Sequence, residues 1–266
     1  MALMELTFRS EALGFDQSIN VLLPEPKDLQ LQKRGEPYRE GLPVLYLFHG
    51  YSDNHTAWLR RSNVERYLHH SAYNMICVLT NMGNFWYTDM AHGYRYQTFI
   101  GEELPNIIES TFRASTKRED RFIAGLSMGG YGALYTALQR PERYAAAASL
   151  SGAVDVAHLR DSVPSLAFET RAVFDVEHKR QLAGTTHDLR YWIDKHVQDG
   201  TPLPKLYQSC GQEDALLENN RGFHQYLLDK GVAHTYFEQP GMDHEWDFWD
   251  SEIRKLINDW LPVVRR

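Results

Sequence analysis

The sequence GLSMGGYG at residues 125–132 constrains the fold of this chain more than any other stretch. It follows the apolar run RFIA at 121–124 and precedes a segment with a helical pattern at 131–139, so a strand, a sharp turn and a helix are predicted. The central serine of such a G-x-S-x-G turn is strained, and its hydroxyl is presented above the sheet. Small flanking residues let strand and helix approach closely. Ser127 is therefore a candidate nucleophile.

The pattern also occurs by chance, because glycines commonly serve turns or close packing. The discriminating question is whether an acid and a histidine follow the serine. Where a nucleophilic serine lies on a strand-to-helix turn, the chain order is serine, acid, histidine.

Apolar runs alternating with helical patterns predict the fold class. Such an alternation is typical of an α/β protein with a mostly parallel central sheet and helices on both faces. Two short β-prone runs around Gly14, at 6–9 and 19–23, predict an N-terminal antiparallel hairpin. The further runs that read as buried strands lie at 44–48, 75–79, 122–124, 145–150, 205–209 and 234–238.

We expect one α/β domain over residues 1–266. Residues 155–204 interrupt the alternation, and we interpret them as a cap-like insertion over the site. The alternative is a surface excursion that has no contact with substrate.

Composition excludes several classes of function. Hydrophobic residues make up 43% of the chain, charged residues 24%, and the formal net charge is −7 without a Lys/Arg cluster, so nucleic acid is not an expected partner. The start has no signal-peptide pattern, and no apolar run is long enough for membrane insertion, so a cytoplasmic protein is expected. Cys77 and Cys210 lie in or at the end of strand-like runs and are predicted to be buried free thiols. A homo-oligomer is compatible with the sequence.

Three of the twelve histidines follow the last strand that could supply an acid: His224, His234 and His244. His224 lies in a helical pattern and His234 begins a strand. His244 instead ends the turn between a strand and the terminal helix, where a loop can deliver an imidazole to the carboxyl edge of the sheet. His244 is the predicted base. The zinc motif HExxH is absent at this position, so no metal is expected.

Asp214 is the predicted acid because it follows the run at 205–208 and precedes a helix, again at the carboxyl edge. Glu213 and Asp155 are competitors, and Asp214 could also serve only as a helix N-cap. Asp243 adjoins the histidine and is poorly placed to meet the far side of its ring.

An oxyanion hole requires two backbone N–H groups. Met128, which follows the nucleophile, supplies one, and Tyr51 in the loop after the 44–48 strand is the candidate for the other. Aromatic residues in the loops predict an apolar pocket. The predicted pocket residues are Trp86, Tyr87 and Trp246.

These residues together resemble the esterase D group of α/β-hydrolases, and within it the tributyrin-esterase-like carboxylesterases. The resemblance implies hydrolysis of short-chain acyl esters without a metal or organic cofactor. The matching segments are FHGYS at 48–52, NVER at 63–66, WYTD at 86–89, GLSMGGYG at 125–132, CGQED at 210–214 and HEW at 244–246.

The related S-formylglutathione hydrolases usually carry a histidine before the nucleophilic serine and another after the paired glycines. Leu126 and Tyr131 occupy those positions here, which counts against a glutathione thioester as the main substrate. Feruloyl esterases share the framework and stay an alternative. Two alternative functions of a different class are a catalytically silent binding module and a peptidase. Because the base must be neutral, activity is expected to fall at acid pH.

Overall fold

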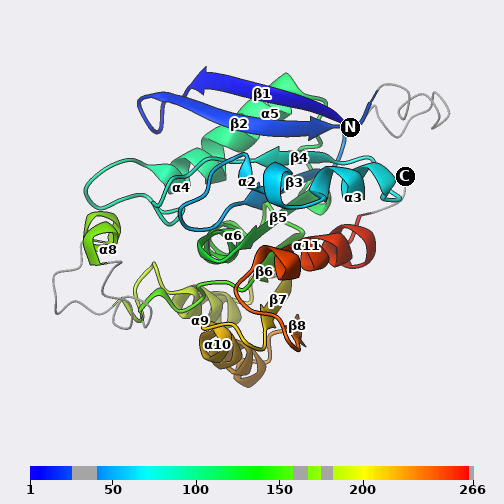
Figure 1. Cartoon of the computed structure of the whole chain (residues 1–266). Helices are drawn as coiled ribbons and strands as arrows, with labels where there is room; N and C mark the ends of the chain where they lie inside the picture. The colour runs from blue at the N-terminus through cyan, green and yellow to red at the C-terminus, as the bar shows by residue number, and fades with distance from the viewer. Residues whose placement is uncertain (26–40, 158–166, 175–181, 264–266) are drawn as a thin grey trace.

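A computed structural model describes residues 1–25, 41–157, 167–174 and 182–263 of the chain. Its centre is an eight-stranded sheet in the order β1-β2-β4-β3-β5-β6-β7-β8 (Figure 1). The first three strands of that order pair antiparallel, and the others pair parallel. The strands are β1 (Ala2–Arg9), β2 (Asp16–Leu23), β3 (Val44–Phe48), β4 (Ile76–Leu79), β5 (Arg121–Leu126), β6 (Ala146–Leu150), β7 (Lys205–Gly211) and β8 (His234–Gln239).

Helices cover both faces of this sheet (Figure 1). One face carries α5, α6, α9 and α10, and the other carries α2, α3, α11 and the π-helix η5 that continues α11. The helices are α2 (Ala57–Arg61), α3 (Val64–His70), α4 (Tyr96–Thr98), η2 (Phe99–Glu103), α5 (Leu104–Thr111), η3 (Arg118–Asp120), α6 (Met128–Gln139), α8 (Ala167–Phe174), α9 (Leu189–Asp199), α10 (Leu217–Asp229), α11 (Trp246–Lys255) and η5 (Leu256–Trp260).

The period-two alternation of strand side chains divides the core into two layers. In β3, Val44 and Tyr46 enter the layer under α6, whereas Leu45 and Leu47 enter the layer under α11. All four are buried, which explains why this strand is apolar throughout rather than alternating. The predicted α/β class, the mostly parallel sheet and the N-terminal hairpin are confirmed.

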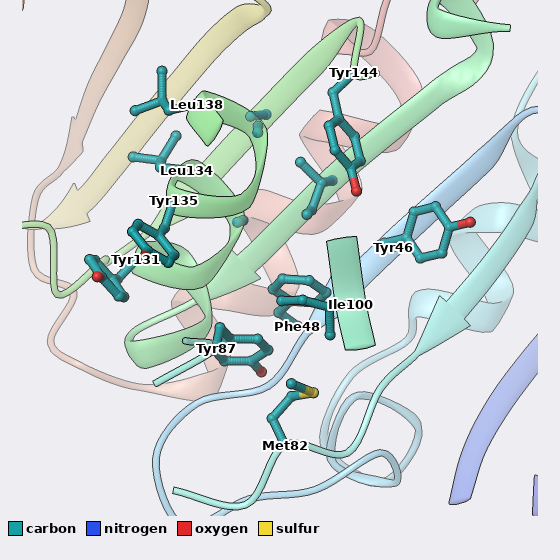
Figure 2. Close-up of a cluster of buried hydrophobic side chains, with 14 of the residues drawn as sticks. Tyr46, Phe48, Met82, Tyr87, Ile100, Tyr131, Leu134, Tyr135, Leu138 and Tyr144 are labelled. Carbon is teal, nitrogen blue, oxygen red and sulfur yellow. The ribbon is translucent and has the colours of Figure 1, made fainter. Parts of the chain in front are cut away.

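The layer under α6 is rich in tyrosine (Figure 2). Tyr131, Leu134 and Leu138 lie on one side of α6 and Phe48 and Tyr46 on the other, and Phe48 stacks on Tyr87 with ring centroids 4.4 Å apart. Helix α6 packs against β5 and β6, and it begins directly after Ser127.

The predicted insertion at 155–204 lies partly outside the described residues. Its described helix α9 packs on α6, where the ring Nε2 of His196 is 2.6 Å from the carbonyl of Leu138. Helix α8 is joined to the loop at 91–92 by backbone bonds to Ala172 and Val173. A cap role for this region stays a prediction.

The two cysteines, Cys77 and Cys210, are free and buried, as expected. Burial raises the pKa of both thiols, which keeps them protonated and unreactive. Within the described ranges no helix has the length and apolar character that crossing a membrane requires.

Candidate active site

Ser127 lies between β5 and α6 in a backbone conformation that residues other than glycine rarely adopt. Its φ is 53° and its ψ is −120°, so the chain reverses sharply at the serine. The surrounding glycines are required by close approach: a Cβ on Gly125 would lie 2.2 Å from the carbonyl oxygen of Gly129. The G-x-S-x-G spacing therefore forms the predicted strained turn, and the serine hydroxyl is partly accessible at the carboxyl edge of the sheet.

The loop between β8 and α11 delivers His244 to the same edge. Gly211, at the end of β7, makes this possible, because a Cβ there would lie 2.2 Å from the carbonyl oxygen of Met242. That carbonyl accepts a hydrogen bond from the Glu213 amide at 2.9 Å. The ring of His244 packs edge-on against Trp249, with centroids 4.9 Å apart. Two loops that are distant in sequence are thus held together behind the imidazole.

Ser127, His244 and Asp214 form a hydrogen-bonded series. The Nδ1 of His244 is 2.8 Å from Oδ2 of Asp214, and its Nε2 is 2.9 Å from the hydroxyl oxygen of Ser127. A carboxylate only accepts, so Nδ1 carries the proton and Nε2 is left to accept from the serine hydroxyl. This tautomer is the one that a general base for Ser127 needs.

Asp214 is fully buried, whereas a third of the His244 side chain is exposed. Burial raises the pKa of the Asp214 carboxyl, but the hydrogen bonds from His244 and from the Leu216 amide outweigh it and hold the pKa below its usual range. The carboxylate therefore stays charged without solvent, and it can stabilise an imidazolium that forms on its partner. The Leu216 bond, at 2.8 Å, closes a turn ahead of α10, whose N-cap is Leu216, so Asp214 is not the N-cap that the sequence offered as its alternative role.

The other residues that the sequence offered as the acid or the base have different surroundings. Asp155 pairs with Arg190 at 3.0 Å, and Glu213 is exposed. His224 and His234 contact each other, with Nδ1 of the first 2.7 Å from Nε2 of the second. Of the candidates that the sequence left open, Asp214 and His244 are the ones that the tertiary structure brings to Ser127.

Met128 and Tyr51 approach the serine from two sides. Met128 is the first residue of α6, and amides in the first turn of a helix have no carbonyl partner within that helix. The loop that carries Tyr51 lies against the nucleophile, since a Cβ on Gly50 would be 3.4 Å from the Cβ of Ser127. The two residues predicted to form an oxyanion hole thus lie in segments that adjoin Ser127, and the role of their N–H groups stays a prediction.

His49 is a residue whose contribution was not recognised in the sequence. It is buried, and its Nε2 accepts from the Met82 amide at 2.9 Å, so its Nδ1 carries the proton and donates to the Gly50 carbonyl at 2.7 Å. In a trans peptide the carbonyl and the next N–H point in opposite directions, so this bond also fixes the direction of the Tyr51 N–H. The signal for this residue in the sequence was the pair His49-Gly50, which is equally typical of the end of a strand.

The pocket residues expected from the sequence separate into two groups. Trp246 lines a cavity of about 370 Å³ into which Ser127 and His244 open. Several residues of this cavity gave no signal in the sequence, among them Asp53 and Arg61. The described residues that line this cavity are Gly50, Tyr51, Ser52, Asp53, Arg61, Leu126, Ser127, His244, Trp246 and Trp249.

Trp86 and Tyr87 are placed differently from the expectation. Both have left-handed backbone conformations, with φ of 56° and 58°, which turn their side chains into the core. The Tyr87 ring fills the space above Gly132, where a Cβ would lie 2.3 Å from its Cγ, and its hydroxyl donates to the His49 carbonyl at 2.8 Å. Tyr87 therefore contacts the loop that carries Tyr51 rather than the cavity.

Among the described residues, no group of three or more His, Cys, Asp or Glu side chains is arranged to hold a metal ion. The chemistry that the site can perform follows from its own groups: a serine hydroxyl, an imidazole aligned on it and a buried carboxylate. This set supports nucleophilic attack on a carbonyl carbon.

Comparison with known proteins agrees with this arrangement. The family model described as "Putative esterase" matches residues 10–258. An acetyl esterase of Caldicellulosiruptor saccharolyticus is 32% identical, with 99% of each chain covered. The Staphylococcus aureus serine hydrolase FphF superposes with a TM-score of 0.88 at 31% identity, covering 99% of both chains. The S-formylglutathione hydrolase FrmB of S. aureus superposes with a TM-score of 0.85 at 31% identity, covering 98% of this chain and 99% of the other.

The chain therefore belongs to this esterase family, and its similarity to FrmB is consistent with the esterase D-like group. Its fold is the α/β-hydrolase fold, and it is a carboxylic ester hydrolase of the serine type.

Proposed function

We propose that the protein is a carboxylesterase that hydrolyses short-chain acyl esters through Ser127, His244 and Asp214. The observation that carries the proposal is the continuous series of hydrogen bonds, 2.9 Å from Ser127 to His244 and 2.8 Å from His244 to Asp214. The cavity of about 370 Å³ fits a small ester. The similarity to an acetyl esterase supports a short acyl group.

In the acylation step, Nε2 of His244 takes the hydroxyl proton as Oγ of Ser127 attacks the ester carbonyl carbon. The N–H groups of Tyr51 and Met128 stabilise the oxyanion, and Asp214 stabilises the imidazolium. The imidazolium then gives its proton to the departing alkoxide, which leaves as the alcohol. Water, deprotonated by the same imidazole, attacks the acyl-enzyme and releases the carboxylic acid and free Ser127.

The test combines chemical labelling with turnover. A fluorophosphonate probe should label the wild-type protein once per chain, because an unactivated serine does not react. Ser127→Ala should lose the label and at least about 10⁴-fold of its p-nitrophenyl butyrate hydrolysis while keeping the wild-type circular dichroism spectrum. Ser251→Ala is the matched control and should behave as wild type, since its hydroxyl binds the Phe248 carbonyl within α11. Turnover retained in Ser127→Ala would disprove the assignment.

An acyl-chain series from acetate to octanoate separates the esterase alternatives, with S-formylglutathione and methyl ferulate included. We expect the highest kcat/KM at two to four acyl carbons. Leu126 and Tyr131, both buried, lie where the formylglutathione hydrolases usually carry histidines, which supports a low rate with the thioester. A dominant rate with either added substrate would reassign the enzyme. Absence of both label and turnover would instead favour a binding module.

A further inference from the structure

One side chain with a permanent positive charge lines the cavity that Ser127 opens into. It belongs to Arg61, the last residue of the short helix α2, and the side chain is exposed to solvent. Apart from the imidazole of His244, the other ionisable side chains among the described residues of the lining are Tyr51 and Asp53. Arg61 is therefore the permanent cation that a bound ester would meet beside Ser127.

One tryptophan contacts this guanidinium, and two further tryptophans pack on that ring. Its Cζ lies 5.9 Å from the ring centroid of Trp246, within the range of a cation–π interaction. Trp246 packs edge-on against Trp58 at 5.1 Å and against Trp249 at 5.3 Å, and Trp249 in turn packs on the imidazole of His244. A continuous series of ring contacts therefore runs from Arg61 through Trp246 and Trp249 to the imidazole of His244.

Arg61 acts electrostatically on the Asp53 carboxylate but does not form an ion pair with it. Asp53 lies 4.0 Å from Arg60, and no ion pair of Arg61 occurs among the described residues. Burial raises the pKa of Asp53, while Arg61 and Arg60 lower it, so a single carboxylate is shared by two arginines. One positive charge is left over, although the whole chain carries a formal net charge of −7.

We propose that Arg61 binds a carboxylate of the substrate, so that the preferred esters carry a negative charge near the ester bond. A guanidinium suits this function because its planar fork donates two parallel hydrogen bonds to a carboxylate. Stacking on Trp246 reduces the side-chain freedom that would be lost on binding. The inference rests on the proposed function, because it assigns the substrate class of the same site.

The experiment compares charged esters with uncharged isosteres in a pH-stat. Monomethyl succinate and methyl levulinate place a carboxylate or a methyl ketone on the acyl side. Acetoxyacetate and acetoxyacetone place the same groups on the alcohol side. For at least one pair, we expect the charged ester to have a kcat/KM about tenfold higher, mainly through KM, as is typical of a hydrogen bond to a charged group.

Arg61→Gln should reduce this charged-to-neutral ratio to about one, whereas Arg61→Lys should keep part of it because the charge is retained but the fork is lost. Arg66→Gln is the matched control: it removes an exposed arginine of α3 that does not line this cavity, and the ratio should stay at the wild-type value. Added salt should lower the ratio in the wild type.

Two results would overturn the proposal. The first is a ratio of one or less for both pairs in the wild type, and the second is a raised ratio that survives in Arg61→Gln. Failure of the proposed function gives a different pattern, in which no ester is hydrolysed and the fluorophosphonate does not label Ser127. In that case the assignment of Arg61 fails with it.

Discussion

At the scale of single residues, the chemistry of this site depends on which nitrogen of His244 carries a proton. The carboxylate of Asp214 decides which nitrogen of His244 carries a proton, and this leaves the other nitrogen free to accept from Ser127. Asp214 can do so because it is buried yet charged, its pKa held down by the hydrogen bonds that it accepts. The residue identities alone would not give this result, since an Asp exposed to water would orient the imidazole only weakly.

Asp214→Asn tests the tautomer directly. An amide that donates to Nδ1 would stabilise the wrong tautomer, so kcat should fall by about 10³ to 10⁴-fold while the fold is retained. The measurement is steady-state hydrolysis of p-nitrophenyl butyrate with the thermal unfolding midpoint as the control. Asp155→Asn should keep wild-type activity, because Asp155 pairs with Arg190 away from the serine. A fall of less than tenfold in Asp214→Asn would contradict the assignment.

At the level of elements, loops at the carboxyl ends of β3, β5, β7 and β8 meet at one edge of the sheet. The loop after β3 is held at several points: Tyr87 binds the His49 carbonyl, His49 binds the Gly50 carbonyl, and Asn84 accepts from the Ser52 amide at 2.7 Å. Each bond removes freedom from the backbone that presents the Tyr51 N–H. An oxyanion donor is effective only when its direction is set before the reaction.

Tyr87→Phe removes one of these bonds without changing the packed ring. We expect kcat to fall by about threefold to tenfold with little change in KM, because the lost bond affects the transition state more than substrate binding. Tyr131→Phe is the matched control, since its hydroxyl also donates to a histidine carbonyl at 2.8 Å, that of His187. The two variants should lose similar stability, about 1 kcal/mol. Equal kcat values for both would show that Tyr87 has only a structural role.

For the molecule as a whole, the burial of His49 makes the free energy of unfolding depend on pH. Burial lowers the pKa of His49 to about 4, and the Met82 amide already donates to its Nε2. A histidine in the unfolded chain titrates near ~6.5, so between about pH 6.5 and 4 the unfolded state binds a proton that the folded state does not. Stability therefore falls as the pH is lowered through this window, by roughly 3 kcal/mol from this residue.

Urea unfolding at pH 7, 5.5 and 4.5 measures this dependence. His49→Asn can still donate to the Gly50 carbonyl but does not titrate, so its free energy of unfolding should depend less steeply on pH than that of the wild type. The comparison of slopes is informative even though the variant is less stable at every pH, because the amide leaves Met82 without its acceptor. Parallel curves for the two proteins would contradict the shifted pKa of His49.

The sequence by itself determined the α/β class, the N-terminal hairpin, the strained turn at Ser127 and the order of serine, acid and histidine. These features are encoded locally: strands by apolar runs, the turn by glycines and the order by position along the chain. The tertiary structure decided which carboxylate meets His244, since Asp155, Glu213 and Asp214 all follow suitable strands. It also decided that Trp86 and Tyr87 enter the core, because left-handed φ angles turn them inward, while Arg61 and Trp246 meet at the cavity. Such contacts depend on how distant segments pack, and no local pattern in the sequence carries that information.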